Sequence, residues 1–165
     1  MDPAQVVNKG VCYVPQTNNV FPTLTVQENL EMGAYIRKDD FRPRLLEIYE
    51  MFPPLSEKKK QAAGELSGGQ RQMVAMGKAL MLEPTILMLD EPTAGLSPIY
   101  RNEIFQIIRQ INASGVPILM VEQNAKQSLA IANRGYVFVD GRNRTTGKGV
   151  DLLNDPEIAT MFLGG

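Results

Sequence analysis

The sequence predicts an α/β protein, a mostly parallel sheet covered by helices with an all-helical lobe inserted into it. Two observations support this prediction. From residue 84 onward, short apolar runs alternate with segments of helical periodicity, as in parallel strands covered by helices. Between residues 25 and 82, helical patterns follow one another without an intervening strand. We therefore expect an α/β core over residues 1–22 and 83–165 and a helical subdomain over residues 23–82.

The composition is that of one globular domain, and it excludes several classes of function. The 165 residues carry a net charge of −1, so the wide basic field that non-specific nucleic-acid binding needs is absent. The longest apolar run, residues 116–121, is far shorter than the ~20 residues that span a bilayer. With no histidine and one cysteine, Cys12, the chain has no imidazole chemistry and no internal disulfide. We expect a cytoplasmic chain that neither binds nucleic acid nor inserts into a membrane.

The first half is expected to hold one strand and three helices. Residues 10–15 have the β-branched apolar character of a strand and end at a proline. Thr25 and Glu28 have capping-box spacing, which is typical of a helix start. Pro53-Pro54 ends the second helix, because proline cannot continue one. The expected helices cover residues 25–35, 41–51 and about 67–82, and the second has Leu45, Leu46, Ile48 and Tyr49 available for burial.

The second half is expected to alternate strands and helices. Residues 86–89 and 117–121 are continuous apolar runs, which are typical of strands buried on both faces. Ser97-Pro98 predicts a helix start with a capping hydroxyl. Asp140-Gly141 predicts a tight hairpin turn. The apolar stripe of the helix after Ser97 is Ile104, Ile107, Ile108 and Ile111, and the remaining elements are a helix over residues 125–132, a strand over 136–139 and a short helix from Asp155-Pro156.

Two short motifs indicate chemistry. In Leu66-Ser67-Gly68-Gly69-Gln70, adjacent glycines at a helix start let backbone N–H groups approach an anion, and Ser67 adds a hydroxyl. This pattern is typical of a phosphate clamp, and the alternative is an ordinary helix entry. Asp90-Glu91 follows a buried strand at the edge where α/β sheets bind ligands. Asp90 can hold Mg²⁺ through water and Glu91 can orient or deprotonate an attacking water, whereas the alternative is a polar pair that merely ends a strand.

In this order, and with Gln16 upstream, the two motifs resemble those of the ATP-binding-cassette (ABC) ATPases, which have a P-loop NTPase fold. The resemblance implies that Gln16 is the Q-loop glutamine, which contacts Mg²⁺ and the lytic water. It implies that Asp90 is the Walker B aspartate and Glu91 the catalytic glutamate, and that Mg²⁺ and ATP are the cofactors. The signature motif would bind the nucleotide of a partner subunit in trans through Ser67, Gly68, Gly69 and Gln70, and the D-loop would be Ala94-Gly95-Leu96-Ser97.

Within that family the chain is similar to the second ATPase subunit of branched-chain amino-acid importers, the LivF type. The resemblance implies a subunit that couples ATP hydrolysis to the uptake of branched-chain or related amino acids. It also implies a peripheral location at the inner face of the plasma membrane, through membrane-embedded permease subunits, and pairing with a second ABC ATPase subunit. The phrases that carry it are residues 24–30, 51–54, 92–98, 121–124 and the ending Phe162-Leu163-Gly164-Gly165.

Two departures from the family pattern affect the expected activity. Gln123 stands where most of the family has a histidine that touches the γ-phosphate; it is either a catalytic residue typical of this subfamily or a simple loop residue. No Gly-x-x-x-x-Gly-Lys-[Ser/Thr] phosphate loop occurs, because the segment from Gly141 to Gly149 has one residue too many between its glycines and no hydroxyl after Lys148. We therefore expect a partial P-loop NTPase fold without the N-terminal Walker A part, inactive as an ATPase alone.

Three classes of function follow from these features. The first is the energy-coupling ATPase subunit just described. The second is a non-catalytic remnant that self-associates as a homo-oligomer and binds no nucleotide, and so needs no cofactor. The third, a DNA-repair cassette, is disfavoured because fewer than fifty residues separate Gln16 from Leu66, too few for the long coiled coils inserted there.

Overall fold

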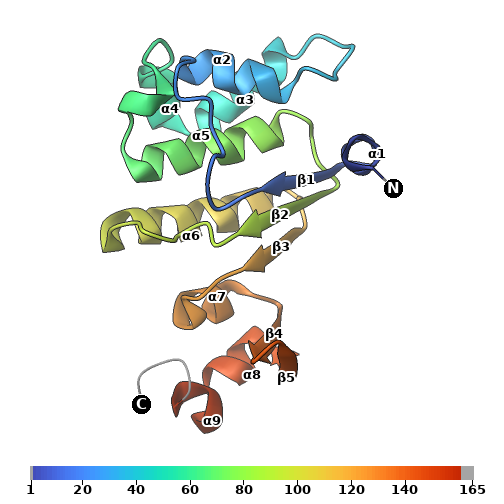
Figure 1. Cartoon of the computed structure of the whole chain (residues 1–165), viewed down its shortest axis with the longest axis vertical. Coiled ribbons are helices and arrows are strands. Elements are labelled where there is room, and N and C mark those ends of the chain that lie inside the picture. The colour runs from blue at the N-terminus through green and yellow to red at the C-terminus, as the bar shows by residue number, and fades with distance from the viewer. Residues whose placement is uncertain (1, 161–165) are drawn as a thin grey trace. The chain divides into compact units, whose positions relative to one another are not determined.

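The computed structural model describes residues 2–160 (Figure 1). The Phe162–Gly165 ending therefore lies outside the described residues. The chain forms two compact units, Met1–Val121 and Glu122–Gly165. Within the described residues, no helix has the length and apolar character needed to cross a membrane.

The first unit is built on a parallel three-stranded sheet, as the sequence predicts. Its strand order is β1-β2-β3, so the Asp90 strand lies in the middle. The register pairs Tyr13 with Met88 and Met88 with Leu119, which places these three side chains on one face of the sheet. The strands are β1 (Val11–Val14), β2 (Ile86–Asp90) and β3 (Ile118–Val121).

Only one face of this sheet is well covered. Cys12, Val14, Leu87 and Leu89 alternate along β1 and β2 and are at most 4% exposed. Helix α5 (Gly68–Leu80) contacts both β1 and α6 (Pro98–Ala113), so the buried face is the one turned toward these helices (Figure 1). On the opposite face the exposed apolar side chains are Tyr13, Leu119 and Val121.

The prediction that residues 86–89 and 117–121 are buried on both faces is therefore wrong. In β2 fully buried and partly buried residues alternate, and in β3 Leu119 and Val121 are 51% and 60% exposed. The physical reason is that β3 is the last strand of the sheet and no described helix of this unit covers its outer face. A continuous apolar run shows that a strand can be buried, but not that a neighbour covers it.

The helical segment follows β1 and precedes β2, and local signals determine its helix starts. Thr25 and Glu28 form the predicted capping box, and Ser67 and Gln70 form a second one that the sequence analysis did not identify. Pro53-Pro54 ends one helix and opens another, α4, which the sequence analysis did not predict. The predicted burial of Leu46 is wrong, because this residue is 63% exposed on the outer side of α3. The elements are α2 (Val26–Gly33), α3 (Arg42–Met51), α4 (Pro53–Glu57), the 3₁₀ turn η1 (Ala63–Glu65) and α5 (Gly68–Leu80).

The loop between β1 and α2 is held by buried amides. The Asn29 side chain is fully buried and accepts from the Phe21 N–H while donating to the carbonyls of Phe21, Leu24 and Thr25. Lys78 Nζ donates to the Asn19 carbonyl at 2.6 Å. These contacts fix the loop that carries Gln16 against the helical segment.

Two further helices complete the first unit. In α1 (Pro3–Asn8), Asp2 caps the start of the helix with a capping box. In α6 (Pro98–Ala113) the four predicted isoleucines are buried. Gly115 lies just after this helix with a φ of +99°, a left-handed conformation that glycine adopts without steric strain. Ser97 occupies the N-cap position as predicted, but its hydroxyl makes no cap hydrogen bond, so that part of the prediction is wrong.

The second unit has its own small core of Leu129, Leu152 and Ile158. Its antiparallel hairpin turns at Asp140-Gly141, where both residues have positive φ as a tight primed turn requires. Asp155 caps the last helix as predicted. The elements are α7 (Ala125–Ile131), β4 (Arg134–Val139), β5 (Arg142–Lys148), α8 (Gly149–Leu153) and α9 (Pro156–Ile158).

Candidate functional site

The carboxyl ends of β1 and β2 bring the first group of predicted residues together. Gln16 follows β1 and Glu91 follows β2, and the two strands are parallel neighbours. Gln16 Nε2 donates to Glu91 Oε2 at 2.6 Å. An amide that donates to a carboxylate fixes the direction of that carboxylate. Gln16, Asp90 and Glu91 thus form one polar cluster at the edge of the sheet.

Tyr13 is a member of this cluster that the sequence analysis missed. Its hydroxyl donates to Asp90 Oδ2 at 2.8 Å. The signal in the sequence is the two-residue alternation of a strand, which places Tyr13 and Pro15 on one face just before Gln16. Using that signal requires the register of β1 against β2, which the sequence alone does not provide.

Glu91 has an unusual backbone conformation. Its φ is +44°, in the left-handed region that costs a non-glycine residue about 1–2 kcal/mol. Its N–H donates to the Val121 carbonyl at 2.9 Å, and its carbonyl accepts from the Ala94 N–H at 3.0 Å. The surrounding backbone therefore holds Glu91 in a strained turn, a feature that is concentrated at functional sites.

The signature residues form a second group at the start of α5. Ser67 Oγ accepts from the Gln70 N–H at 3.2 Å, and Gln70 Oε1 accepts from the Ser67 N–H at 3.2 Å. Lys58 Nζ lies 3.4 Å from Gln70 Oε1 and brings a positive charge to this helix start. The N–H groups of a first helical turn lack intrahelical acceptors and point outward, which suits an anion.

The two glycines of this motif also serve packing. A Cβ on Gly69 would lie 2.4 Å from Cδ1 of Tyr100, and a Cβ on Gly68 would lie 3.3 Å from Cδ2 of Leu96. The start of α5 therefore lies directly against the first turn of α6 and the residue Leu96 just before it. Close helix contact at Gly69 is a reason for glycine that the sequence analysis did not identify.

Two predicted residues remain, Ser97 and Gln123. Ser97 is exposed at the start of α6, one residue after Leu96. Gln123 belongs to the second unit, where it is exposed and its carbonyl accepts from the Ala125 N–H at 2.8 Å.

The donor set of the first group suits Mg²⁺. Asp90 and Glu91 offer carboxylate oxygens and Gln16 an amide oxygen, the hard ligands that Mg²⁺ binds together with water. No group of three or more His, Cys, Asp or Glu side chains that could hold a metal ion occurs among residues 2–160. With two carboxylates and one amide, these residues would fit a Mg²⁺ ion whose other ligands are waters or substrate oxygens, as is usual for this ion.

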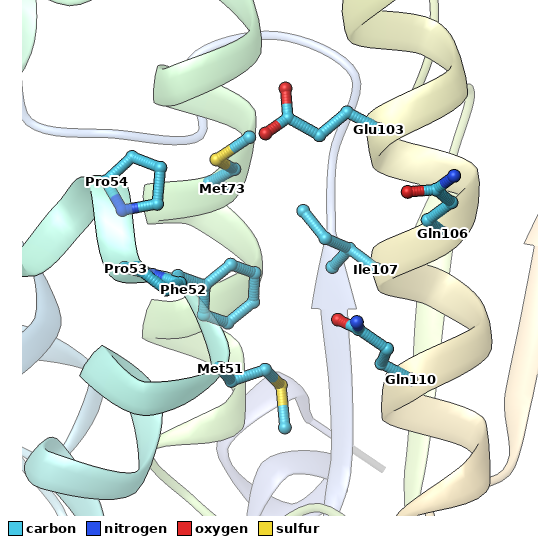
Figure 2. A pocket seen from close by; sticks show the side chains of 9 residues that line it. All are labelled: Met51, Phe52, Pro53, Pro54, Met73, Glu103, Gln106, Ile107 and Gln110. Carbon is cyan, nitrogen blue, oxygen red and sulfur yellow. The ribbon is translucent and has the colours of Figure 1, made fainter.

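Of two cavities in the first unit, the larger borders the first group, because Tyr13 lines it. One, of about 180 Å³, lies between the α3–α4 turn and α6; Phe52, Met73 and Ile107 form its apolar side, and Glu103 lies at its rim (Figure 2). The other, of about 320 Å³, is lined by parts of β1, the Gln16 loop, α2 and α5. None of the predicted site residues lines either cavity.

The Tyr13–Asp90 hydrogen bond predicts a pH-dependent stability. This bond, with smaller contributions from burial and the Asp90 charge, raises the pKa of Tyr13 above its ordinary 10.0. Neutral Tyr13 donates the bond, so its stabilisation is present below pH 10.0 and is lost as the pH rises through the higher folded-state pKa. We expect the stability difference between wild type and Tyr13→Phe to shrink above about pH 10, measured by urea unfolding across the alkaline range. A difference that stays constant with pH would contradict the role of this bond.

Comparison with known proteins gives the family of the chain. The profile of the ABC transporter family matches residues 2–94. The high-affinity branched-chain amino acid transport ATP-binding protein BraG of Pseudomonas aeruginosa is 44% identical over 161 residues, which are 97% of this chain and 69% of the relative. The probable branched-chain amino acid transport ATP-binding protein LivF of Archaeoglobus fulgidus is 41% identical over 94% of this chain and 66% of its own length. The chain thus spans about two thirds of the length of these relatives.

Solved structures agree with this result. An ATP-binding cassette of an ABC transporter in its ADP conformation superposes with a TM-score of 0.83 at 28% identity, covering 100% of this chain and 72% of that one. A nucleotide-free cassette gives a TM-score of 0.81 with the same coverage. These matches confirm the predicted α/β ABC ATPase fold, with its parallel sheet and helices. The chain belongs to the ATP-binding cassette family of ABC transporters.

Proposed function

We propose that this chain is an ATP-binding subunit of an ABC importer for branched-chain or related amino acids. Its two relatives, both branched-chain amino acid transport ATP-binding proteins, support this substrate class. We further propose that, of the two halves of a nucleotide site shared between paired cassettes, this chain supplies the signature half. The observation that carries the proposal is the capped start of α5, where Ser67 and Gln70 leave the outward N–H groups of the first turn beside Lys58.

The physical argument is electrostatic. A helix start concentrates partial positive charge at its N–H groups, and an anion bound there gains from the helix dipole as well as from hydrogen bonds. The capping box fixes Ser67, so its hydroxyl and the backbone of Gly68 and Gly69 need no rearrangement to meet a phosphate. Preorganised donors of this kind stabilise the charge of phosphoryl transfer. We expect them to act on a nucleotide held by the phosphate loop of a partner cassette.

The cluster at Glu91 would serve a separate site. There Gln16 orients the Glu91 carboxylate, which in turn would orient or deprotonate a water. We propose separately that Gln123, which belongs to the second unit, contacts a γ-phosphate. Mg²⁺, if held by Asp90 and Gln16, would supply charge neutralisation at the phosphates. This half of the chemistry also needs a phosphate loop, and residues 1–165 contain none.

Coupling to transport requires a surface for the permease, and we assign it to the larger cavity. Phe21, Met32 and Tyr35 are 45%, 44% and 74% exposed around it. Lys78 lies 4.9 Å from the Phe21 ring centroid and donates to Asn19, which ties this surface to the loop that carries Gln16. An apolar segment of a membrane-embedded permease that binds here would contact the surface that is tied to that loop.

A rescue experiment tests the signature-half proposal. The chain is mixed with a full-length partner cassette whose own signature is disabled, and ATP turnover is measured. We expect partial rescue, abolished by Ser67→Asp, because aspartate keeps the helix cap but places a negative charge where the phosphate would sit. Ser67→Arg, which fills the clamp, should act alike. Glu91→Gln is the matched control and should rescue as well as wild type.

The outcomes separate the two functions left open by the sequence. Rescue that is lost with both Ser67 variants and kept with Glu91→Gln supports the proposal. Equal loss from Glu91→Gln, or no rescue at any ratio, contradicts it. The second result would favour the non-catalytic, self-associating alternative.

A further inference from the structure

Asn19, in the loop after β1, connects the backbone beside Gln16 to the helix that carries the signature residues. The Asn19 Nδ2 group donates to Gln72 Oε1 on α5 at 2.8 Å and to the Pro15 carbonyl at 3.3 Å. The Asn19 carbonyl accepts from Lys78 Nζ, also on α5, at 2.6 Å. Helix α5 therefore holds Asn19 through two side chains, one at its amide group and one at its backbone.

The contact with Pro15 extends this hold to Gln16. The loop turns back at Asn18, whose φ is +54°, a left-handed conformation that asparagine adopts more readily than most residues. After this turn the Asn19 amide reaches the Pro15 carbonyl, which shares one rigid peptide plane with the Gln16 N–H. Gln16 Nε2 in turn donates to Glu91 Oε2 at 2.6 Å. Three hydrogen bonds and one peptide bond thus lead from α5 to the Glu91 carboxylate.

Gln72 makes this connection at a cost to stability. The residue is 7% exposed, and its buried Nε2 has no hydrogen-bond acceptor among residues 2–160. A buried amide donor without an acceptor is unfavourable, and an apolar side chain of similar length would avoid that penalty. Because fold stability does not explain an amide here, Gln72 calls for a functional reason.

We propose that Gln72 is a positioning residue, which acts through Asn19 to hold Gln16 in the orientation that directs the Glu91 carboxylate. The far end of the same loop is held separately, by Asn29 at Phe21. Loss of the Gln72 contact should therefore loosen the Gln16 end of the loop without releasing the whole loop. The importance of this contact for ATP turnover rests on the proposed function, whereas its effect on Gln16 does not.

NMR of the side-chain amides of the full ¹⁵N-labelled chain tests the proposal, with the Gln16 signal assigned by its loss in Gln16→Ala. Glu91→Ala gives the position of that signal without the hydrogen bond to Glu91. In Gln72→Met we expect the Gln16 signal to move at least half of the way to its position in Glu91→Ala. Methionine is of similar length and removes the contact with Asn19 and the unpaired amide group together, so the urea midpoint should not fall.

Gln27→Met is the matched control, because the Gln27 side chain donates to Glu31 of its own helix, α2, at 2.8 Å. It should leave the Gln16 signal in place, whereas Asn19→Ala should move it as Gln72→Met does. A signal that stays in place in both Gln72→Met and Asn19→Ala overturns the proposal. So does an equal shift in Gln27→Met, or a shift in Gln72→Met that accompanies a lower urea midpoint. If the Gln16 signal moves as expected but the rescue experiment fails, the result counts against the proposed function alone.

Discussion

Calorimetric titration of the isolated chain with Mg-ATP is expected to show no saturable binding in the micromolar range, and the chain alone should not hydrolyse ATP. The site at the end of the sheet offers Asp90 and Glu91, two carboxylates that repel phosphate oxygens unless a cation lies between them. No phosphate loop within the 165 residues supplies the compensating N–H groups and lysine. Losing one preorganised donor to a transition state costs about 10²–10³ in rate, so losing the whole set should abolish turnover.

The expected affinity of the isolated chain for Mg-ATP follows from the same missing contacts. A dissociation constant of about 1 μM requires about −8.2 kcal/mol, and one of about 1 mM requires about −4.1 kcal/mol. Because few phosphate contacts remain, we expect the dissociation constant of the isolated chain for Mg-ATP to be about 1 mM or higher. The full-length Pseudomonas aeruginosa relative, titrated under the same conditions, is the positive control. One-site binding of the isolated chain near 1 μM would refute the prediction, and would mean that other residues of this chain hold the phosphates.

Features set by a few neighbouring residues were predictable from the sequence. The helix starts at Thr25, Ser67 and Asp155 all occur where the sequence places them. Each depends on side chains and N–H groups within three residues of one another, so no knowledge of the fold is required. The Asp140-Gly141 turn was predictable for the same reason, because it depends on the positive φ that these two residue types tolerate.

Features set by distant neighbours were not predictable. Leu119 and Val121 are as apolar as Leu87 and Leu89, yet only the second pair is buried. The difference lies in which helices reach each strand, and the composition of a strand does not encode that. The burial predicted for Leu46 failed for the same reason.

The candidate site also combines features set by neighbouring residues with features set by distant ones. Its parts could be identified from motifs, because Gln16, Ser67 and Glu91 stand in patterns with a known physical use. The Tyr13–Asp90 hydrogen bond joins residues 77 positions apart and depends on strand register. The contact that makes glycine necessary at Gly69 depends on a tyrosine in another helix.

A large loss of stability is expected from Gly33→Ala, at the end of α2. A Cβ on Gly33 would lie 2.1 Å from the carbonyl oxygen of Lys78 and 2.9 Å from its carbonyl carbon, both backbone atoms of α5. A helix backbone cannot move aside as a side chain can, so α2 and α5 must separate. Helix propensity alone would favour alanine by about 1 kcal/mol. We expect instead a loss of more than about 3 kcal/mol in the free energy of unfolding, measured with urea.

Alanine substitutions at two other glycines are expected to cost less stability than Gly33→Ala. A Cβ on Gly77 would meet Leu30 Cδ2 at 2.9 Å and Ile48 Cγ2 at 3.1 Å, the ends of side chains that can shift in part. Gly77→Ala should therefore cost about 1–3 kcal/mol, as overpacking a core does. Gly68→Ala meets only Leu96 Cδ2, at 3.3 Å, and should change stability by about 0.5 kcal/mol or less. If Gly33→Ala proved as stable as Gly68→Ala, the close backbone contact between α2 and α5 would be wrong, and with it the rigid link between the Gln16 loop and the helix that carries the signature residues.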